Sequence, residues 1–393
     1  MSRLRAAAAA LLGRGATPLA VTAPASLLEH RRRGSAPLAE GAADTAGAKS
    51  LSVAVVVPSF RRGSGGHRAI AELVRGLEAR GHHCSLWICD EEGRHAGQAP
   101  AELSASFSAW FGPVAGQLHA SFERWSGVDV AVATGWQTVP RVLLLGGVKA
   151  RAYLVLDHEP EFHATSAERE WAAWTYDQGL HAIAGSQWLA GLLRERYGAS
   201  ADGFDFGIDH DTYRPLQGVR RRDDRVLFYA RAVTARRAVP LGLLALSELR
   251  RRRPQTTIAL FGESRTLEPG FCVENLGVLE PAALARAYGE ATAGVVLSMT
   301  NPSLIGPEML ACGLPVVELA SDAMRATFGG GPMLLAPFDP LALADAIEGL
   351  LDDPAERERR AARGLELAAG RTWGAAAAAV EAGLRSALTR AAG

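Results

Sequence analysis

The sequence predicts an α/β protein built from two consecutive doubly wound units that face each other across a cleft. Three observations predict it. Short β-branched runs alternate with stretches of helical spacing from residue 51 onward, this alternation begins again near residue 223, and the chain ends in a long helical segment. Such alternation is typical of parallel sheets covered by helices. Ligands bind beyond the carboxyl ends of the strands in these sheets, so the cleft between two of them is the expected site.

The first unit begins at residue 51, and its run "VAVVV" at 53–57 fits a strand buried on both faces. Apolar residues then recur at helical spacing from Ile70 to Leu77, and Gly81 ends that helix. The remaining elements expected in this unit are strands at 84–90, 128–135, 150–160 and 181–186, with helices at 166–179 and 186–197.

The second unit repeats the pattern after a connection near 206–222. Its expected strands are 223–232, 256–264, 293–299 and 314–320, and its expected helices are 238–251, 281–289 and one beginning at 306–313, before a C-terminal segment that is helical throughout. The sequence therefore predicts a poorly ordered segment at 1–50, a Rossmann-like domain at 51–205, a second one at 206–373, and a C-terminal helix at 374–393 that packs back on the first domain.

Composition excludes several classes of protein. The 393 residues carry no net charge, which gives no indication of a nucleic-acid partner. The four cysteines form no CxxC pair and no zinc-like cluster with histidine, so we expect them to be reduced and buried in a cytoplasmic protein. No stretch approaches the roughly 20 apolar residues that cross a bilayer.

The N-terminal "MSRLRAAAAALLGRG" has the basic start of a secretory signal, but its alanine-rich run ends at Arg14 and no convincing cleavage site follows. We therefore expect an alanine-rich tail rather than a signal. Peripheral contact with the inner face of the cell membrane, through Arg3, Arg5 and Arg31–Arg33, stays open as an alternative.

The turn "SFRRGSGGHRAI" joins the first strand to its helix. Its glycines, Gly63, Gly65 and Gly66, let the backbone approach a ligand closely, and a helix N-terminus favours an anion. The spacing is not G-x-G-x-x-G, because His67 follows, so a dinucleotide fingerprint is not indicated. A tight turn that binds nothing is the alternative.

Arginines follow the first strand of the second unit in "FYARAVTARRAV". Arg231 lies at the end of the strand, and Arg236 and Arg237 lie at the entrance of the next helix. Guanidinium groups beside a helix N-terminus suit a diphosphate. The alternative is a solvated arginine face, which is our interpretation of the run at 250–253.

Two further carboxylate features are candidates. Glu308 stands alone in an apolar stretch at the first turn of a helix, where it either complements the helix dipole or accepts hydrogen bonds from two sugar hydroxyls. The segment "DHEPEFH" places five titratable groups in seven positions after a strand. Its spacing matches no standard metal site, so hydrogen bonding to a polyhydroxyl ligand or acid–base chemistry is favoured over a metal. These five groups are Asp157, His158, Glu159, Glu161 and His163.

Taken in order, "ARAVTARR", "FGES", "NPSLIGPEMLACGLPVVE", "DPLALADAIEGLLDDP" and "RTW" resemble the C-terminal half of glycosyltransferase family 4. The first half is similar to a rhamnosyltransferase-like branch, through "VPSFRRGSGGHRAI", "DHEPEF" and "FDFGIDHDTYRP". The resemblance covers roughly residues 51–390. It implies a retaining enzyme of the GT-B fold, with an acceptor-side domain followed by a donor domain.

The resemblance also implies roles for single residues. Arg231 and Arg236 would hold the donor diphosphate, and Glu308, the second glutamate of an E-x7-E pair, would bind the donor ribose. Thr300 replaces the first glutamate, which fits a 6-deoxy sugar donor or a weakened activity. Asp157, His158 and Glu159 would orient the acceptor or stabilise the sugar cation. The other residues expected at the donor are Gly65, Gly66, His67, Gly262, Val278, Asn301, Ser303 and Leu304.

The expected reaction moves a hexose, such as rhamnose or another 6-deoxyhexose, from a nucleoside diphosphate sugar to a saccharide or glycolipid acceptor in cell-surface polysaccharide synthesis. No cofactor and no metal are expected, because arginines and a helix dipole would neutralise the leaving diphosphate. Two alternatives stay open: a nucleotide-sugar-binding relative with weakened catalysis, for which Thr300 is the argument, and a nucleotide-sugar epimerase.

Overall fold

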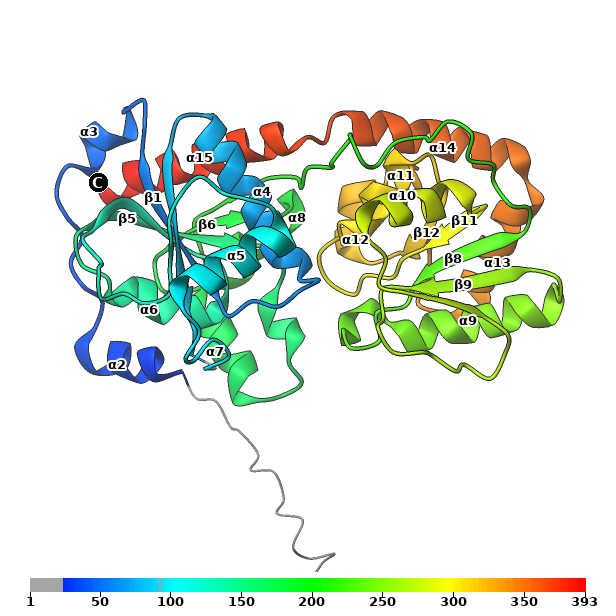
Figure 1. The fold of residues 1–393 in the computed structure, drawn as a ribbon, viewed down its shortest axis with the longest axis horizontal. Helices are drawn as coiled ribbons and strands as arrows, with labels where there is room; N and C mark the ends of the chain where they lie inside the picture. The colour runs from blue at the N-terminus through cyan, green and yellow to red at the C-terminus, as the bar shows by residue number, and fades with distance from the viewer. Residues whose placement is uncertain (1–23, 92) are drawn as a thin grey trace, which may run out of the picture.

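The computed structural model describes residues 24–91 and 93–393. The chain forms two lobes, each built on one parallel sheet with helices against it (Figure 1). We call residues 24–205 together with 373–391 the first lobe, and residues 206–372 the second lobe. The α/β class and the two facing units that the sequence predicts are confirmed.

The first sheet has seven strands in the order β3-β2-β1-β4-β5-β6-β7. Strand β1 pairs with both β2 and β4, so the strand order reverses beside it. Because successive side chains of a strand point to opposite faces, Val55 of β1 lies in one core cluster and Val56 in the other. The strand is therefore buried on both faces, as "VAVVV" predicts. The strands are β1 (Ser52–Pro58), β2 (His83–Cys89), β3 (Leu118–His119), β4 (Val128–Ala133), β5 (Val148–Val155), β6 (His181–Ala184) and β7 (Ala201–Gly203).

Helices cover both faces of this sheet. One face packs against α4 and the C-terminal α15 through residues such as Leu73 and Leu384, and the other packs against α6 and α8 through Val142 and Leu189. Each fully buried side chain of this size contributes roughly 1.5–3 kcal/mol. The helices before residue 206 are α2 (Ala25–Arg33), α3 (Ala42–Ala46), α4 (Gly65–Ala79), α5 (Pro100–Phe111), α6 (Val139–Leu144), α7 (Ala167–Thr175) and α8 (Gln187–Tyr197), with short 3-10 turns η1 (Trp136–Thr138) and η2 (Glu159–Phe162).

The second sheet repeats this topology with six strands in the order β10-β9-β8-β11-β12-β13. The order again reverses beside its first strand, β8. Such reversals leave room for a ligand beyond the carboxyl ends of the neighbouring strands. The strands are β8 (Arg225–Tyr229), β9 (Thr257–Phe261), β10 (Glu274–Gly277), β11 (Ala293–Val295), β12 (Val316–Leu319) and β13 (Met333–Ala336).

Helices of the second lobe follow the predicted alternation, but the C-terminal segment is divided. Asp353 and Thr372 each cap a new helix by accepting a hydrogen bond from a backbone N–H, and Pro354 cannot continue the preceding one. The helical segment therefore becomes three helices. The helices and turn of the second lobe are η3 (Ala235–Arg237), α9 (Val239–Arg252), α10 (Pro281–Glu290), α11 (Ile305–Ala311), α12 (Asp322–Phe328), α13 (Pro340–Asp352) and α14 (Pro354–Ala369), and α15 (Trp373–Ala391) returns to the first lobe.

Two segments of chain cross between the lobes side by side. Ile208 forms an isolated parallel bridge with Thr372, and the Ile208 N–H donates to the Arg371 carbonyl at 3.0 Å. A Cβ on Gly207 would lie 2.3 Å from the Trp373 nitrogen, so only glycine fits there. After this crossing, α15 returns over α4 of the first lobe (Figure 1).

The contact between α4 and α15 depends on a glycine. A Cβ on Gly76 of α4 would lie 2.4 Å from the Cβ of Ala377 in α15. We expect Gly76→Ala to lower the free energy of unfolding by about 1–3 kcal/mol, the usual cost of overpacking, measured by urea denaturation.

Gly191 of α8 is the matched control, because a Cβ there would meet nothing within 4 Å. Gly191→Ala removes a helical glycine without a clash, so we expect it to stabilise the protein by about 0.5–1 kcal/mol. Equal effects of the two substitutions would contradict the packing argument.

Residues 24–50 differ from the poorly ordered segment that the sequence predicts. Helix α2 buries Ser26 and His30, whose ring lies 5.6 Å from that of Trp174, and α3 buries Ala42 beside α15. These tertiary contacts order a segment that has no sustained periodicity of its own. Residues 1–23, including Arg3 and Arg5, lie outside the described residues. In the part of the chain that the structure describes, no helix has the length and apolar character needed to cross a membrane.

Candidate active site

The candidate site lies where the carboxyl ends of the two sheets meet. Three loops contribute to it: 156–163 after β5, 230–238 after β8 and 296–304 after β11. The predicted strands at 150–160 and 293–299 end earlier than expected, at Val155 and Val295. The residues released from these strands form the contacts between the lobes.

Arg231 and Arg236 behave differently from Arg237. Arg231 is half-buried, and its side chain has no hydrogen-bond or ion-pair partner among the described residues. Arg236 donates from Nε to Asp157 Oδ2 of the first lobe at 3.0 Å, and its guanidinium lies 3.9 Å from the centre of the Phe162 ring. Arg237 is buried and donates to Ser298 Oγ at 2.7 Å, so it joins the loop 230–238 to the loop 296–304 within the second lobe.

The arginine loop leads into α9, whose N-terminus has no side-chain cap and no acidic residue in its first turn. Uncapped N–H groups and the positive end of the helix dipole favour an anion. The terminal nitrogens of Arg236 make no hydrogen bond within the described chain. This edge of the second sheet therefore offers several unfilled donors to a phosphate.

Glu308 on α11 is a buried carboxylate without hydrogen bonds. Its exposed fraction is 7%, and burial raises its pKa to about 7. The nearest cation is Arg68 of α4 in the first lobe, with Nη1 3.9 Å from the carboxylate, and no described residue donates a hydrogen bond to it. A carboxylate left in this state has free acceptors for the hydroxyl groups of a ligand.

Arg68 is a residue that the sequence analysis missed. Its Nη1 also lies 3.5 Å from the Tyr213 hydroxyl, and its guanidinium lies 5.8 Å from the centre of that ring. It thus contacts two side chains of the second lobe from the first turn of α4. Its position next to the glycine turn was the available signal.

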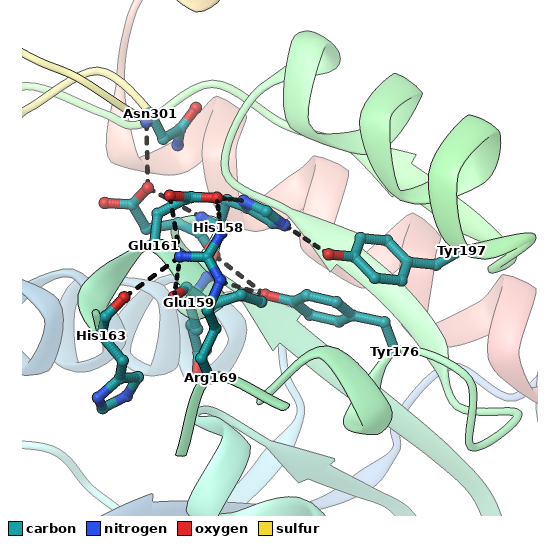
Figure 2. Close-up of polar contacts among 10 residues, drawn as sticks. His158, Glu159, Glu161, His163, Arg169, Tyr176, Tyr197 and Asn301 are labelled. Carbon is teal, nitrogen blue, oxygen red and sulfur yellow. Dashed lines mark hydrogen bonds and ion pairs between the residues drawn. The ribbon is translucent and has the colours of Figure 1, made fainter. Parts of the chain in front are cut away.

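The side chains of the segment "DHEPEFH" take different partners, and Figure 2 shows His158 joined to Tyr197 and Glu161 joined to Arg169. Asp157 faces the second lobe and binds Arg236. His158 is buried, shares a hydrogen bond with the Tyr197 hydroxyl at 2.8 Å, and has its pKa lowered by burial. Glu161 instead pairs with Arg169 near the surface.

Glu159 belongs to the core of the first lobe. Its carboxylate accepts hydrogen bonds from the Tyr153 hydroxyl at 2.9 Å and the Trp136 N–H at 2.6 Å, while its own N–H donates to the Tyr176 hydroxyl at 3.0 Å. Burial raises its pKa to about 7. Glu159 and His158 therefore hold the loop in place, and Asp157 is the member of the predicted set that reaches the other lobe.

Metal binding has no geometric support in this segment. Across residues 24–91 and 93–393, no group of three or more His, Cys, Asp or Glu side chains is arranged to hold a metal ion. The metal-free reaction stays a prediction.

The glycine turn has free space around Gly65 and Gly66, whereas the His67 side chain is hydrogen-bonded within the turn. A Cβ on Gly65 would meet nothing within 4 Å, and one on Gly66 would meet only Leu156, at 3.8 Å. His67 uses both ring nitrogens within the turn, on Ser64 Oγ at 2.8 Å and on the Pro58 carbonyl at 3.3 Å. Burial lowers the pKa of His67 to about 4, so the ring is neutral near pH 7 and fixes the turn.

The remaining predicted donor residues lie at the same edge of the second lobe. Gly262 has φ +92°, and a Cβ there would lie 2.4 Å from the Tyr229 ring. Val278 is 57% exposed and free to contact a ligand. Ser303 Oγ accepts from the Ile305 N–H at 3.1 Å, and Leu304 packs against the core of the first lobe.

Asn301 and Thr300 differ from what the sequence predicts. Asn301 is 1% exposed, and its side chain is bonded to the first lobe rather than free for a sugar. Thr300 is 5% exposed, and its hydroxyl has no hydrogen-bond partner within the described part of the chain. Sequence alone could not show that the first lobe covers this loop.

A separate cavity of about 220 Å³ lies away from this site, at the amino ends of β5 and β6. It is lined by Arg151, His181 and Arg390, among others. The Arg151 donors are bound to the Val142, Leu145 and Ala36 carbonyls, and His181 is bound to Ser200 and Asp202. We place the candidate active site between the lobes, because the unfilled donors and acceptors there lie at the carboxyl ends of the strands, whereas this cavity lies at amino ends.

Known proteins share this architecture. Sucrose-phosphate synthase from Thermosynechococcus elongatus aligns with a TM-score of 0.63 and 18% identity, over 86% of this chain and 99% of its own. Anabaena HepE, solved in complex with UDP and glucose, aligns with a TM-score of 0.64 and 14% identity, over 86% of this chain and 100% of its own. The chain therefore has the GT-B fold, as the sequence resemblance implied.

Sequence comparisons narrow the class further. Residues 224–348 match the family model described as "WsaF, C-terminal domain". The O-antigen biosynthesis protein RfbC of Myxococcus xanthus is 28% identical over 251 residues, which is 62% of this chain and 20% of RfbC. The D-inositol 3-phosphate glycosyltransferase of Frankia alni is 34% identical over 235 residues, 51% of this chain and 58% of that protein. The matches thus span 20% and 58% of the length of these curated relatives.

Proposed function

We propose that the chain is a retaining, metal-independent glycosyltransferase of family 4. It transfers a sugar from a nucleoside diphosphate sugar to a saccharide or glycolipid acceptor in polysaccharide or glycoconjugate synthesis. The observation that carries the proposal is the set of unfilled groups at one edge of the second sheet: Arg231, the terminal nitrogens of Arg236 and the Glu308 carboxylate. Cationic donors suit a diphosphate, and a buried acceptor suits the ribose hydroxyls.

The relatives support the same reaction class. The curated relatives are named for O-antigen biosynthesis and for glycosyl transfer to an inositol phosphate, and HepE was solved with UDP-glucose as well as with UDP. These names and the UDP-glucose complex support a nucleoside diphosphate sugar as the donor that we propose for this chain. Thr300, at the place where the resemblance puts a glutamate, favours rhamnose or another 6-deoxyhexose as the transferred sugar.

The reaction follows from the positions of these groups. The bond between the anomeric carbon and the β-phosphate oxygen breaks, and the leaving diphosphate gains negative charge that Arg231 and Arg236 stabilise. The acceptor hydroxyl attacks from the same face and forms the new bond to the anomeric carbon. Its proton passes to the released phosphate oxygen, so configuration is retained without a protein base.

We place this reaction in the cytoplasm, at the inner face of the cell membrane. Arg31, Arg32 and Arg33 support peripheral contact with anionic lipid, because they are exposed at the end of α2.

A second candidate function is nucleotide-sugar binding without transfer. The buried Thr300 hydroxyl favours it, because a ligand reaches that group only if the loop moves. The two functions differ in whether an acceptor consumes the donor.

A panel of UDP, GDP and dTDP tests the proposed function. We expect one diphosphate, at about 100 times its Kd, to stabilise the protein by about 2.7 kcal/mol and so to raise Tm by several degrees. The shift should persist in EDTA, because the proposed site neutralises the diphosphate with arginines. Differential scanning fluorimetry measures it, followed by donor consumption with and without acceptor sugars. A shift that needs Mg²⁺ or Mn²⁺ would exclude the metal-free mechanism, and binding without consumption of donor would select the second candidate.

A further inference from the structure

Asn301 belongs to the second lobe by sequence, but its polar atoms are bonded to the first lobe. Its Nδ2 donates to the Leu156 and Gly185 carbonyls at 3.0 and 3.1 Å, and its Oδ1 accepts from Ser186 Oγ at 2.6 Å. Its main-chain N–H donates to Asp157 Oδ1 at 3.0 Å (Figure 2). The side chain is thus fully used at the carboxyl ends of β5 and β6.

Asp157 connects this contact to the arginine loop. Its Oδ1 accepts from the Asn301 N–H and from the His158 N–H, and its Oδ2 accepts from Arg236 Nε. One first-lobe carboxylate therefore holds two second-lobe loops at once. The Arg236 guanidinium is oriented through Nε, which leaves its other two nitrogens without a hydrogen bond inside the described chain.

Covalent connection between the lobes does not by itself fix their orientation. The chain crosses between them in two adjacent segments, 206–208 and 371–373, which resemble a hinge. Across the boundary, the Arg62–Glu280 ion pair is between exposed side chains, the Arg68–Glu308 pair is 3.9 Å long, and the Arg371–Asp205 pair, 3.4 Å long, lies beside the crossing itself. The Asn301 and Asp157 contacts are the short and buried ones, so we expect them to dominate the closed arrangement.

We propose that Asn301 and Asp157 form an interlobe latch that closes the two lobes and positions Arg236 for the donor diphosphate. The latch is a positioning device, and neither residue needs to touch the reacting atoms. The claim that the latch closes the lobes does not rest on the proposed function, whereas the claim that the latch affects sugar transfer does. In the closed protein the loop 298–304 is held by the first lobe, so opening would loosen that loop and Arg236 together.

Asn301→Asp is the sharpest test of the latch. The new carboxylate can still accept from Ser186, but it cannot donate to the Leu156 and Gly185 carbonyls and instead repels them. We expect amide hydrogen exchange in residues 298–304, 156–158 and 185–187 to become roughly tenfold faster or more. Local opening of these segments costs less free energy in the variant, because the Asn301 side-chain bonds no longer have to be broken. Small-angle scattering should show a larger radius of gyration.

Asn275→Asp is the matched control. Asn275 lies in the same lobe, and within the described residues its side chain exchanges hydrogen bonds only with the Leu267 backbone. The same chemical change should therefore leave the three segments and the radius of gyration unaltered. Asp157→Asn is the second variant, in case Asn301→Asp folds poorly. It keeps the shape but weakens the ion pair with Arg236, and it should speed exchange in the same segments.

Folded Asn301→Asp and Asp157→Asn proteins with wild-type exchange in those segments would overturn the latch. In a transfer assay with UDP-glucose or another accepted donor, the latch predicts a raised KM for the donor and a smaller change in kcat. Faster exchange in both variants, together with no sugar transfer by the wild type, would support the latch and contradict the proposed function. A failure of the latch and a failure of the proposed function can therefore be told apart.

Discussion

Arg231→Ala is expected to lower kcat/KM for sugar transfer by about 10²–10³, because it removes one of two guanidinium groups that stabilise the leaving diphosphate. The Arg231 side chain has no hydrogen-bond or ion-pair partner among the described residues, so its loss breaks no polar contact that holds the fold. Tm should therefore stay within a degree or so of the wild type, since a surface change of this kind costs roughly 0.5 kcal/mol or less. Steady-state release of nucleoside diphosphate measures the rate.

Two further variants separate geometry from charge. Arg231→Lys keeps the positive charge but loses the planar fork, so we expect an intermediate rate. Arg251→Ala removes a 72% exposed arginine that pairs with Glu248 on α9, and we expect it to leave the rate unchanged. A wild-type rate in Arg231→Ala, or an equal loss in Arg251→Ala, would show that the leaving group is not held at this edge of the sheet.

Periodicity was sufficient for the inner strands of both sheets, but not for the edge strands β3, β7, β10 and β13 or for the segments that depend on tertiary contacts. Strand β1 is buried on both faces and is visible as an uninterrupted aliphatic run. Strands β3 and β7 are two and three residues long, too short for a period to be recognised. Helices α2 and α3 are ordered by packing against residues such as Trp174 and by α15, which lies more than 300 positions away in the chain.

Part of the candidate site could be proposed from the sequence, where charged residues follow directly after a strand. Arg231, Arg236 and Glu308 could be found from their positions. A charged residue at the carboxyl end of an apolar strand, or at the start of an apolar helix, is not explained by packing and therefore indicates a function. The roles of His158 and Asn301 could not. They depend on Tyr197 and on the Leu156 and Gly185 carbonyls, which approach only when the lobes fold and meet.

Glu308→Gln is expected to have opposite effects on stability and on donor binding. The pKa of Glu308 is raised to about 7 from the ordinary 4.5, so between these values the folded protein keeps a proton that the unfolded chain has lost. The stability contributed by this group is therefore complete below pH 4.5 and is lost as pH rises through about 7. The loss is roughly 3–4 kcal/mol, since the pKa rises by about 2.5 units and each unit is worth about 1.4 kcal/mol.

Glutamine cannot ionise, so the variant should match the wild type near pH 4.5 and exceed its stability at pH 8, as measured by urea denaturation at both values. UDP binding at pH 8 should weaken by about tenfold to a hundredfold, the cost of losing a charged acceptor for hydroxyl groups, as measured by calorimetry. Binding by the wild type should also weaken as pH falls below 7.

Glu318→Gln is the control for Glu308→Gln, because it changes a buried carboxylate that already accepts hydrogen bonds within the protein. Burial raises the pKa of Glu318 to about 7 as well, but its carboxylate already accepts from the Ser298 and Leu319 N–H groups. Replacing it weakens those bonds, so we expect little or no gain in stability at pH 8. If Glu308→Gln behaved like Glu318→Gln, the Glu308 carboxylate would have a hydrogen-bond donor within the protein. If instead Glu308→Gln alone stabilises the fold and weakens UDP binding, the protein keeps an unfavourable buried charge because a ligand uses it.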